Sequence, residues 1–380
     1  MNSPLPVIHW IENQETRSLH WHSENSTPAP KRIQLADDTM SAETAYRLAC
    51  EGTALFWRGD FQNAKNLLQA IARRIDKKPA KAKKTAKPIA SGAQAFHLHR
   101  QAQSQRARIL GMLIIQINAD FSIPLRRAPN VEQACINVYG KVEHSFAISL
   151  RELLGIIGAH EWRKNGVEVS ALGAKIYPHY GVFSPVRGEY LELLAKAPLP
   201  ANHLAFDIGT GTGVIAALLA RRGVTKIIAT DQDPRALTCA AANLQNLGVE
   251  EQVELIKADL FPEGRAPLLI CNPPWIPARP NAAIEYAIYD PDSRMLKAFL
   301  MGVANHLEPA GEAWLIMSDL AEHLGLRSKE EFWNWIDAGG LTVIGKMDIR
   351  PQHAKSKDEN DPLHQARAAE ITSLWRLRLK

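Results

Sequence analysis

The sequence predicts an α/β protein in which a doubly wound, mostly parallel sheet follows a smaller, largely helical N-terminal domain. From Leu204 onward, short apolar runs alternate with segments of helical spacing. Such alternation builds βαβ units, whose parallel strands are buried between two layers of helices. From Ser41 to about residue 165, helical spacing dominates instead. The length of 380 residues exceeds what one hydrophobic core usually organises, which favours two domains.

The N-terminal half divides into three expected parts. Residues 1–76 are expected to form a helical region, residues 77–92 a basic linker of Lys, Ala and Pro, and residues 93–165 a mixed, mostly helical region for substrate recognition. Residues 51–71 resemble one helical hairpin of the tetratricopeptide type. Solenoid repeats need about three neighbours to bury their faces, so these residues favour a local helical pair in a mixed domain.

The basic charge of the chain is concentrated in the linker. Its six lysines are Lys77, Lys78, Lys81, Lys83, Lys84 and Lys87, and it contains no acidic residue. Taking these six charges from the formal net charge of +5 leaves −1 for the rest of the chain. Such a stretch can contact phosphates, in which case binding weakens steeply with salt. It can equally be a solvated, self-repelling linker.

Composition predicts a cytoplasmic protein that does not enter membranes. A hydrophobic fraction of 46% and a charged fraction of 22% are typical of globular proteins. No apolar run approaches the roughly 18 to 20 residues that span a bilayer, and the N-terminus lacks the pattern of a signal peptide. The cysteines show no paired spacing, which indicates reduced thiols. The histidines lack the accompanying ligands of a metal site, so we expect none.

The second half of the chain, residues 166–380, contains the expected parallel sheet. Seven apolar runs are interpreted as its strands: 204–209, 226–231, 253–260, 267–272, 313–319, 341–349 and 371–379. The glycine loop Gly209–Gly213, with Thr210 and Gly211 inside it, follows the first strand and opens a helix, the context of a nucleotide-binding turn. Glycines allow the tight turn and let a ligand approach the backbone. The loop also fits the G-x-G-x-x-A pattern of dinucleotide enzymes, because Ala216 follows it.

Three carboxylates follow successive strands of this sheet. Asp207 precedes the glycine loop, where it could accept from an ammonium group or from loop amides. Asp231 ends the second strand, where an acidic residue commonly binds ribose hydroxyls, and Asp259 ends the third, where it could bind an adenine amino group. Any one of them could be a solvated carboxylate or a helix cap. Together, at the edge where such sheets bind ligands, they favour a cofactor site.

The tetrapeptide Asn272-Pro273-Pro274-Trp275 follows the fourth strand. Two prolines remove backbone donors and hold the preceding residues extended, so the corner presents oxygen acceptors rigidly. Two acceptors that grip the N–H groups of an amide or nucleobase amine would orient its nitrogen and stabilise the developing positive charge. Trp275 offers a flat surface for a planar group. The nitrogen sheds its proton readily once methylated, so no general base is expected.

Four blocks in this order resemble the class I S-adenosylmethionine-dependent methyltransferases of the small-domain branch, with their Rossmann-like sheet. The blocks are FDIGTGTGVIA, ATDQDPRAL, AANLQNLGVEEQVELIKADLF and CNPPWIP. The branch includes HemK-type protein-glutamine methyltransferases and ribosomal-RNA guanine-amine methyltransferases. The resemblance implies S-adenosylmethionine as cofactor, with Asp207 and the glycine loop along its methionine part, Asp231 on the ribose and Asp259 near the adenine. The preceding GVFSPVRGEY also resembles the family, which implies that Phe183, Pro185 and Arg187 flank the cofactor. In the family, the corner at Asn272 is catalytic and borders the cofactor.

The resemblance leaves two substrates open. NPPWIP is similar to the NPPYIP of the glutamine enzymes, but residues 289–294 depart from their pattern and the N-terminal part is about twice as long. The basic linker and the GVFS lead-in suit ribosomal RNA. We therefore expect an N-methyltransferase of a macromolecule, leaning to a nucleobase amine in ribosomal RNA. The alternative is a glutamine amide of a translation protein. A non-catalytic RNA-binding protein and a dinucleotide oxidoreductase are less favoured, since neither explains the Asn-Pro-Pro-Trp corner.

Overall fold

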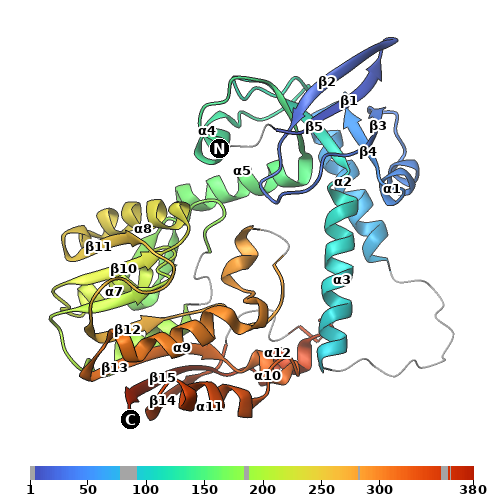
Figure 1. The fold of residues 1–380 in the computed structure, drawn as a ribbon. Coiled ribbons are helices and arrows are strands. Elements are labelled where there is room, and N and C mark those ends of the chain that lie inside the picture. The colour runs from blue at the N-terminus through green and yellow to red at the C-terminus, as the bar shows by residue number, and fades with distance from the viewer. Residues whose placement is uncertain (1–4, 78–91, 184–187, 281–282, 352–357, 360) are drawn as a thin grey trace, which may run out of the picture. The chain divides into compact units, whose positions relative to one another are not determined.

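The computed structural model describes residues 5–77, 92–183, 188–280, 283–351, 358–359 and 361–380. It divides into two compact units, which we describe separately (Figure 1). The N-terminal unit comprises Met1–Ile89 and Leu98–Glu161, and the C-terminal unit comprises Ala90–His97 and Trp162–Lys380. Five of the six linker lysines lie outside the described residues, so their expected contact with phosphates stays a prediction.

The N-terminal unit is an α/β structure, and the expectation that it is largely helical is wrong. Its sheet has the order β1-β2-β6-β5-β4-β3. The strands are β1 (Val7–Glu12), β2 (Glu15–Trp21), β3 (Arg32–Ala36), β4 (Thr53–Trp57), β5 (Leu113–Ile117) and β6 (Phe146–Ser149). The helices are α1 (Ala42–Cys50), α2 (Phe61–Asp76), α3 (Gly92–Leu110), α4 (Glu132–Tyr139) and α5 (Leu150–Asn165). The chain passes between the two units within α3 and within α5.

The segment 51–71 shows why the expected helical pair is wrong. Helix α1 ends at Cys50, and Gly52 turns the chain with a φ of +80°. The apolar run Thr53–Trp57 then forms β4, which is buried between parallel β3 and β5. Only the second half is helical: α2 begins after Asp60, whose carboxylate caps it by accepting from the Gln62 amide. A short apolar run has no period that separates a buried strand from a helix, so strand pairing decides.

The first residues of the chain, which fall in the expected helical region 1–76, instead form a hairpin at the edge of this sheet. β1 and β2 pair antiparallel, and Asn13 and Gln14 join them with φ values of 54° and 66°. Two successive residues with positive φ match the twist of paired strands. Figure 1 shows the tip of this hairpin projecting beyond the other strands of the N-terminal unit.

The C-terminal unit contains the expected doubly wound sheet, and all seven expected strands are present. Their order is β11-β10-β9-β12-β13-β15-β14. The strands are β9 (Ala205–Ile208), β10 (Ile227–Asp231), β11 (Val253–Lys257), β12 (Ala266–Cys271), β13 (Leu307–Ser318), β14 (Leu341–Ile349) and β15 (Thr372–Leu379). The first five run parallel, whereas β15 is antiparallel to both its neighbours. A short antiparallel hairpin, β7 (Val167–Val169) and β8 (Ala174–Ile176), precedes them.

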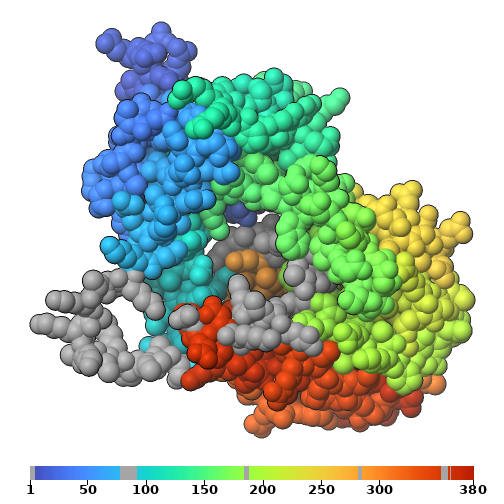
Figure 2. All heavy atoms as spheres, turned by 180° about the vertical axis from the view of Figure 1, so that it is seen from behind, coloured from blue at the N-terminus to red at the C-terminus, as the bar shows by residue number. Residues whose placement is uncertain are grey.

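Helices cover both faces of this sheet. They are α6 (Glu189–Lys196), α7 (Val214–Arg221), α8 (Pro234–Leu247), α9 (Arg294–His306), α10 (Leu320–His323), α11 (Lys329–Ala338) and α12 (His364–Ala369). Alternate residues of β12 enter opposite cores: Leu268 and Ile270 pack with α6 and α7, whereas Leu269 and Cys271 pack with α9 and α11. The space-filling view shows the atoms of this unit, from yellow-green to red, gathered in one body (Figure 2).

None of the helices within the described residues has the length and apolarity needed to cross a membrane. Among the same residues, no group of three or more His, Cys, Asp or Glu side chains could hold a metal ion.

Candidate active site

A cavity of about 740 Å³ opens at the carboxyl ends of the parallel strands in the C-terminal unit. The loops after β9, β10, β11 and β12 line it, together with the start of α9. In open α/β sheets this edge, where the strand order reverses beside the first strand, is where ligands bind. The volume lies within the range of about 300–1,000 Å³ found for small-molecule and cofactor pockets.

The glycine loop forms one wall of the cavity. Gly209, Gly211 and Gly213 all have positive φ, between 55° and 78°. A Cβ on Gly213 would lie 3.1 Å from the Cβ of Ala240, so glycine is needed there for packing against α8. At Gly211 a Cβ would meet nothing within 4 Å, so this part of the loop faces open space. The loop thus leaves its backbone accessible to a ligand.

Asp207 holds this loop from behind, and it does not itself line the cavity. The carboxylate is fully buried and accepts hydrogen bonds from the Thr210 hydroxyl at 2.7 Å and the Ala216 amide at 3.2 Å. Its Oδ1 atom has no hydrogen-bond partner among the described residues. Burial raises the pKa of this carboxyl to about 7. Asp207 thus contacts the loop through the Thr210 hydroxyl and the following helix α7 through the Ala216 amide, so neither role considered from sequence is the one observed.

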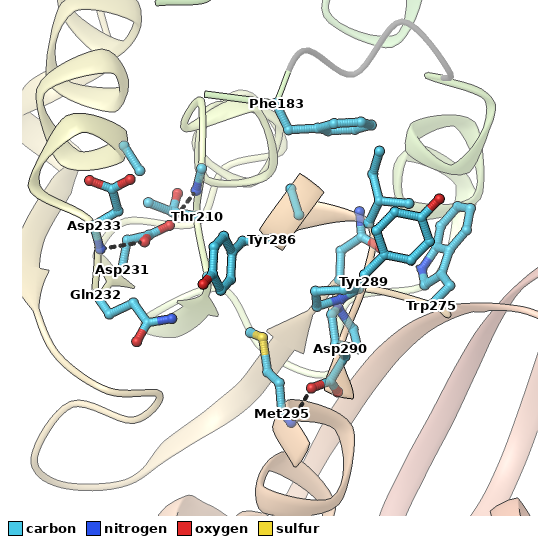
Figure 3. A pocket seen from close by; sticks show the side chains of 18 of the residues that line it. Phe183, Thr210, Asp231, Gln232, Asp233, Trp275, Tyr286, Tyr289, Asp290 and Met295 are labelled. Atoms are coloured by element: carbon cyan, nitrogen blue, oxygen red, sulfur yellow. Dashed lines mark hydrogen bonds between the residues drawn. The ribbon is translucent and has the colours of Figure 1, made fainter. Parts of the chain in front are cut away.

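Asp231 connects the end of β10 to the glycine loop. Its carboxylate accepts from the Gly211 amide at 3.0 Å and from the Asp233 amide at 2.9 Å, and it lines the cavity (Figure 3). Burial raises its pKa. Asp259 also lines the cavity, but its side chain is 72% exposed and lies 3.7 Å from Arg294. The two carboxylates therefore occupy different parts of the cavity, one half-buried and one at the rim.

The Asn-Pro-Pro-Trp corner lies across the cavity from the glycine loop. All four of its residues line the cavity. The indole Nε1 of Trp275 donates a hydrogen bond to Asn272 Oδ1 at 3.0 Å. Figure 3 shows Tyr289 and Trp275 on one side of the cavity and Thr210, Asp231 and Gln232 on the other, with Phe183 and Tyr286 between them. Of the three lead-in residues, Phe183 lines the cavity, whereas Pro185 and Arg187 lie outside the described residues.

Sequence reasoning missed several residues of this cavity. Tyr286, Tyr289 and Met295 line it but come from the segment that was noted only as a departure from the family pattern. This segment pairs with the corner, since Tyr289 bridges Ile276 and the Asp290 amide donates to the Ile276 carbonyl at 2.9 Å. The Asp290 carboxylate accepts from the Met295 and Leu296 amides at the start of α9. An Asp-Pro pair before a helix could have indicated this cap.

Two further residues come from more distant parts of the chain. Tyr190 on α6 lines the cavity and is 5% exposed; a tyrosine on an amphipathic helix is indistinguishable from a core residue by sequence. Phe96, from the start of α3, packs with Ile276, and its ring centroid lies 6.4 Å from that of Tyr289. It belongs to the C-terminal unit although it precedes the cofactor motifs by about a hundred residues. No sequence signal links it to the site.

Comparisons with known proteins find relatives of the second half of the chain. Residues 174–331 match the family model described as methyltransferase small domain. The release factor glutamine methyltransferase of Cereibacter sphaeroides is 40% identical over 156 residues, which cover 37% of this chain and 53% of the relative. That of Gloeobacter violaceus is 33% identical over 172 residues, covering 41% and 58%. The ribosomal protein uL3 glutamine methyltransferase of Neisseria gonorrhoeae is 28% identical over 151 residues, covering 36% and 50%.

The chain spans about half the length of these curated relatives. Residues 174–331 lie in the C-terminal unit and include all described residues that line the cavity except Arg367. Residues 174–331 are thus similar to the methyltransferase small domain, within the class I S-adenosylmethionine-dependent methyltransferases. The resemblance read from the four sequence blocks is confirmed.

Proposed function

We propose that this chain, built on a methyltransferase small domain, transfers the methyl group of S-adenosylmethionine to the side-chain amide nitrogen of a glutamine in a translation protein. The observation that carries the proposal is the corner at Asn272, which lines the cavity and whose side-chain oxygen is held by the Trp275 indole. The relatives support the choice of glutamine, because all three are named for glutamine in a release factor or a ribosomal protein.

The cavity fits the cofactor in its size and in the hydrogen-bonding groups that line it. The open backbone at Gly211 would border the methionine part, and the half-buried carboxylate of Asp231 would accept from ribose hydroxyls. Asp259 at the rim would lie near the adenine, with Phe183 as a further flanking ring. When bound, the cofactor supplies an electrophilic methyl group on a sulfonium.

The chemistry left to the protein is orientation of a poor nucleophile. The lone pair of an amide nitrogen is delocalised, so the nitrogen must be turned until its lone pair points at the methyl group. Asn272 Oδ1 and the carbonyl at the Asn272–Pro273 junction are acceptors for its two N–H groups. Because both acceptors are held before the substrate arrives, they stabilise the positive charge that develops on the nitrogen without reorganising. The methylated nitrogen then loses a proton, which needs no buried base.

The glutamine amide is now better supported as substrate than the nucleobase amine of ribosomal RNA that the sequence analysis favoured. A guanine or adenine amine presents the same flat NH₂ group as a glutamine amide, so the corner fits either. The observation in favour of RNA is the run of six linker lysines, and that run lies almost wholly outside the described residues. The relatives that match the cavity-bearing part favour the protein substrate instead.

The test is transfer of label from tritiated S-adenosylmethionine. We expect the purified protein, added to an extract of cells that lack it, to label a protein that releases N5-methylglutamine on enzymatic digestion. An Asn272→Ala variant should label nothing, whereas Asn334→Ala, an exposed position on α11, should label the same protein as the wild type. Label in ribosomal RNA would replace the glutamine proposal by the RNA alternative.

A further inference from the structure

The side chain of Asn272 lies between two aromatic residues that come from different elements. Trp275, three residues later in the corner, donates its indole N–H to Asn272 Oδ1 at 3.0 Å. Tyr190, on α6, also interacts with the side chain of Asn272, which lowers the pKa of its phenol. Tyr190 is 5% exposed and Trp275 is half-buried, and all three side chains border the cavity.

The chemistry of these partners decides which way round the Asn272 amide lies. The two ends of an amide have almost the same shape, so shape does not distinguish them. An indole N–H can only donate, which means that the atom of Asn272 facing Trp275 must be the oxygen. The NH₂ end therefore faces Tyr190. Burial raises the pKa of the Tyr190 phenol, and the nearby Asp207 adds to this. The phenol thus stays neutral, and its oxygen can accept from the NH₂ group.

Trp275 is itself held through both its backbone and its ring. Its backbone carbonyl accepts from Arg327 Nη1 at 3.5 Å, and the side chain of Arg327 is 3% exposed. The Trp275 ring packs against the buried residues of the sheet and against the cluster that contains Phe96 and Ile276. The donor is therefore fixed in position before substrate binds, at little further entropic cost.

We propose that Trp275 and Tyr190 are positioning residues that lock the Asn272 amide with its oxygen, not its NH₂ group, available to the acceptor nitrogen. The inference deepens the proposed N-methyl transfer and rests on it. An amide oxygen accepts two hydrogen bonds, so one lone pair remains for a substrate N–H after the indole has used the other. In the reversed orientation, two NH₂ groups would face each other with no acceptor between them, and a substrate with an NH₂ group would be rejected.

The first experiment removes each partner while keeping the ring. Trp275→Phe deletes the indole N–H, and we expect kcat to fall by about 10- to 100-fold, as for other losses of reactant orientation. The affinity for S-adenosylhomocysteine and the melting temperature should stay unchanged. Tyr190→Phe should give a smaller fall in kcat. The combined variant should lose less than the product of the two single effects, because both act through one amide. Trp333→Phe, at an exposed position outside the cavity, is the matched control.

A second set of variants distinguishes the orienting role proposed for Trp275, the lock on Asn272, from a purely structural role of its ring. An aspartate at position 272 has two equivalent oxygens, so its orientation no longer matters. Trp275→Phe should therefore cost less kcat in an Asn272→Asp background than in the wild type. An equal cost in both backgrounds would overturn the lock. A Trp275→Phe variant that keeps kcat within about twofold, or that loses cofactor affinity in proportion to kcat, would also overturn it.

A substrate-free measurement keeps this inference distinguishable from the proposed function. The Trp275 indole proton can be assigned in a nitrogen–proton correlation spectrum as the signal absent from Trp275→Phe. We expect its exchange with solvent to be slower in the wild type than in Asn272→Ala. Slow exchange in a protein that methylates no glutamine would preserve the lock and refute the proposed function. Equal exchange rates in both proteins would refute the lock, whatever the substrate.

Discussion

The two units differ at the carboxyl ends of their parallel strands. In the C-terminal unit, a cavity of about 740 Å³ opens at the ends of β9, β10 and β12. In the N-terminal unit, the charged side chains at the ends of β3 and β4 pair with one another. Both edges belong to parallel strands followed by helices, the arrangement that binds ligands in many α/β sheets. Both edges carry aspartates at or just after the end of a strand. The two sets of aspartates differ in the groups that they contact.

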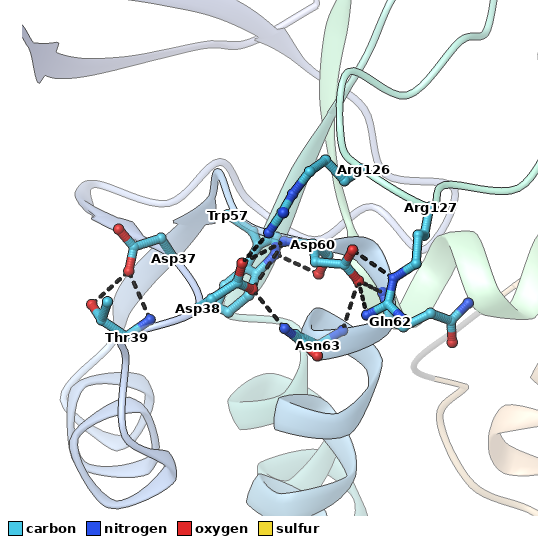
Figure 4. Close-up of polar contacts among 9 residues, drawn as sticks. All are labelled: Asp37, Asp38, Thr39, Trp57, Asp60, Gln62, Asn63, Arg126 and Arg127. Atoms are coloured by element: carbon cyan, nitrogen blue, oxygen red, sulfur yellow. Dashed lines mark hydrogen bonds and ion pairs between the residues drawn. The ribbon is translucent and has the colours of Figure 1, made fainter.

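In the N-terminal unit two arginines neutralise the aspartates (Figure 4). Arg127 reaches Asp60 with two nitrogens, at 2.7 and 2.9 Å. Arg126 lies 3.0 Å from Asp38, which also accepts from the Asp60 amide at 3.0 Å. A Cβ on Gly59 would lie 2.5 Å from Asp38 Oδ1, so the backbone is packed directly against this carboxylate. The polar groups at this edge are satisfied by one another.

In the C-terminal unit Asp207 and Asp231 accept hydrogen bonds from backbone amides, and neither forms an ion pair among the described residues. The pKa of Asp207 is raised to about 7 and that of Asp231 is raised, in both cases by burial. The hydrogen bond from Arg127 lowers the pKa of Asp60, and the Asp60 amide lowers that of Asp38. The difference teaches that the sheet edge alone does not make a binding site. A site remains where the polar groups still lack partners that a ligand can supply.

The largest effect that would test this comparison is expected at the Asn272 corner. Asn272→Ala should reduce kcat by about 10²- to 10³-fold, the loss typical of removing one acceptor or donor that stabilises developing charge. The affinity for S-adenosylhomocysteine, measured by calorimetry, should change little. Asn334→Ala on the surface of α11 serves as the control and should change neither quantity. Retained activity in Asn272→Ala would remove the proposed acceptor role.

The next largest expected effect is a loss of affinity for the cofactor. Asp231→Ala should weaken S-adenosylhomocysteine binding by about 10- to 100-fold, the equivalent of one or two hydrogen bonds to a charged group. Calorimetry measures this directly. Asp337→Ala, on an exposed side chain paired with Lys380, is the control. If Asp231→Ala binds as tightly as the wild type, this carboxylate only supports the glycine loop.

The corresponding change at the N-terminal edge should affect stability and not binding. Asp60→Ala removes both the cap of α2 and the partner of Arg127, so the midpoint of denaturant unfolding of the N-terminal unit should fall. Cofactor affinity should stay within about twofold of the wild type, as for substitutions remote from a site. Weaker cofactor binding by this variant would contradict the contrast between the two edges.

The smallest effect is a difference in pH dependence. Asp207 has an ordinary pKa of 3.8 and a folded pKa of about 7, so the folded protein binds more protons between these values. The free energy of unfolding therefore falls as pH rises through that window. The lowered pKa values of Asp38 and Asp60 act oppositely, since they contribute stability that is lost as pH falls through the ordinary carboxyl range.

Urea unfolding of the wild type and Asp207→Asn at about pH 4.5 and about pH 7.5 measures this contribution. The stability of Asp207→Asn relative to the wild type should be greater at the higher pH. An equal difference at both pH values would mean that Asp207 does not titrate in this range.

Much of the C-terminal unit could be predicted from its sequence, because local signals there agree with the tertiary structure. The strand that contains Asp207, the glycines that follow and the corner at Asn272 occur in an order that resembles one family. The N-terminal unit offered no such order. The run Thr53–Trp57 is too short for its period to distinguish a strand from a helix, and its partners β3 and β5 lie far along the chain on either side.

The sequence by itself determined the doubly wound sheet, the cofactor class and the acceptor corner, because each depends on residues that are close in the chain or that follow successive strands. Only the tertiary structure decided that Tyr190 and Trp275 converge on Asn272, that Phe96 supports the corner, and that the N-terminal edge is closed by Arg126 and Arg127. These contacts join residues on separate elements. Whether two such residues meet depends on packing and not on their spacing along the chain.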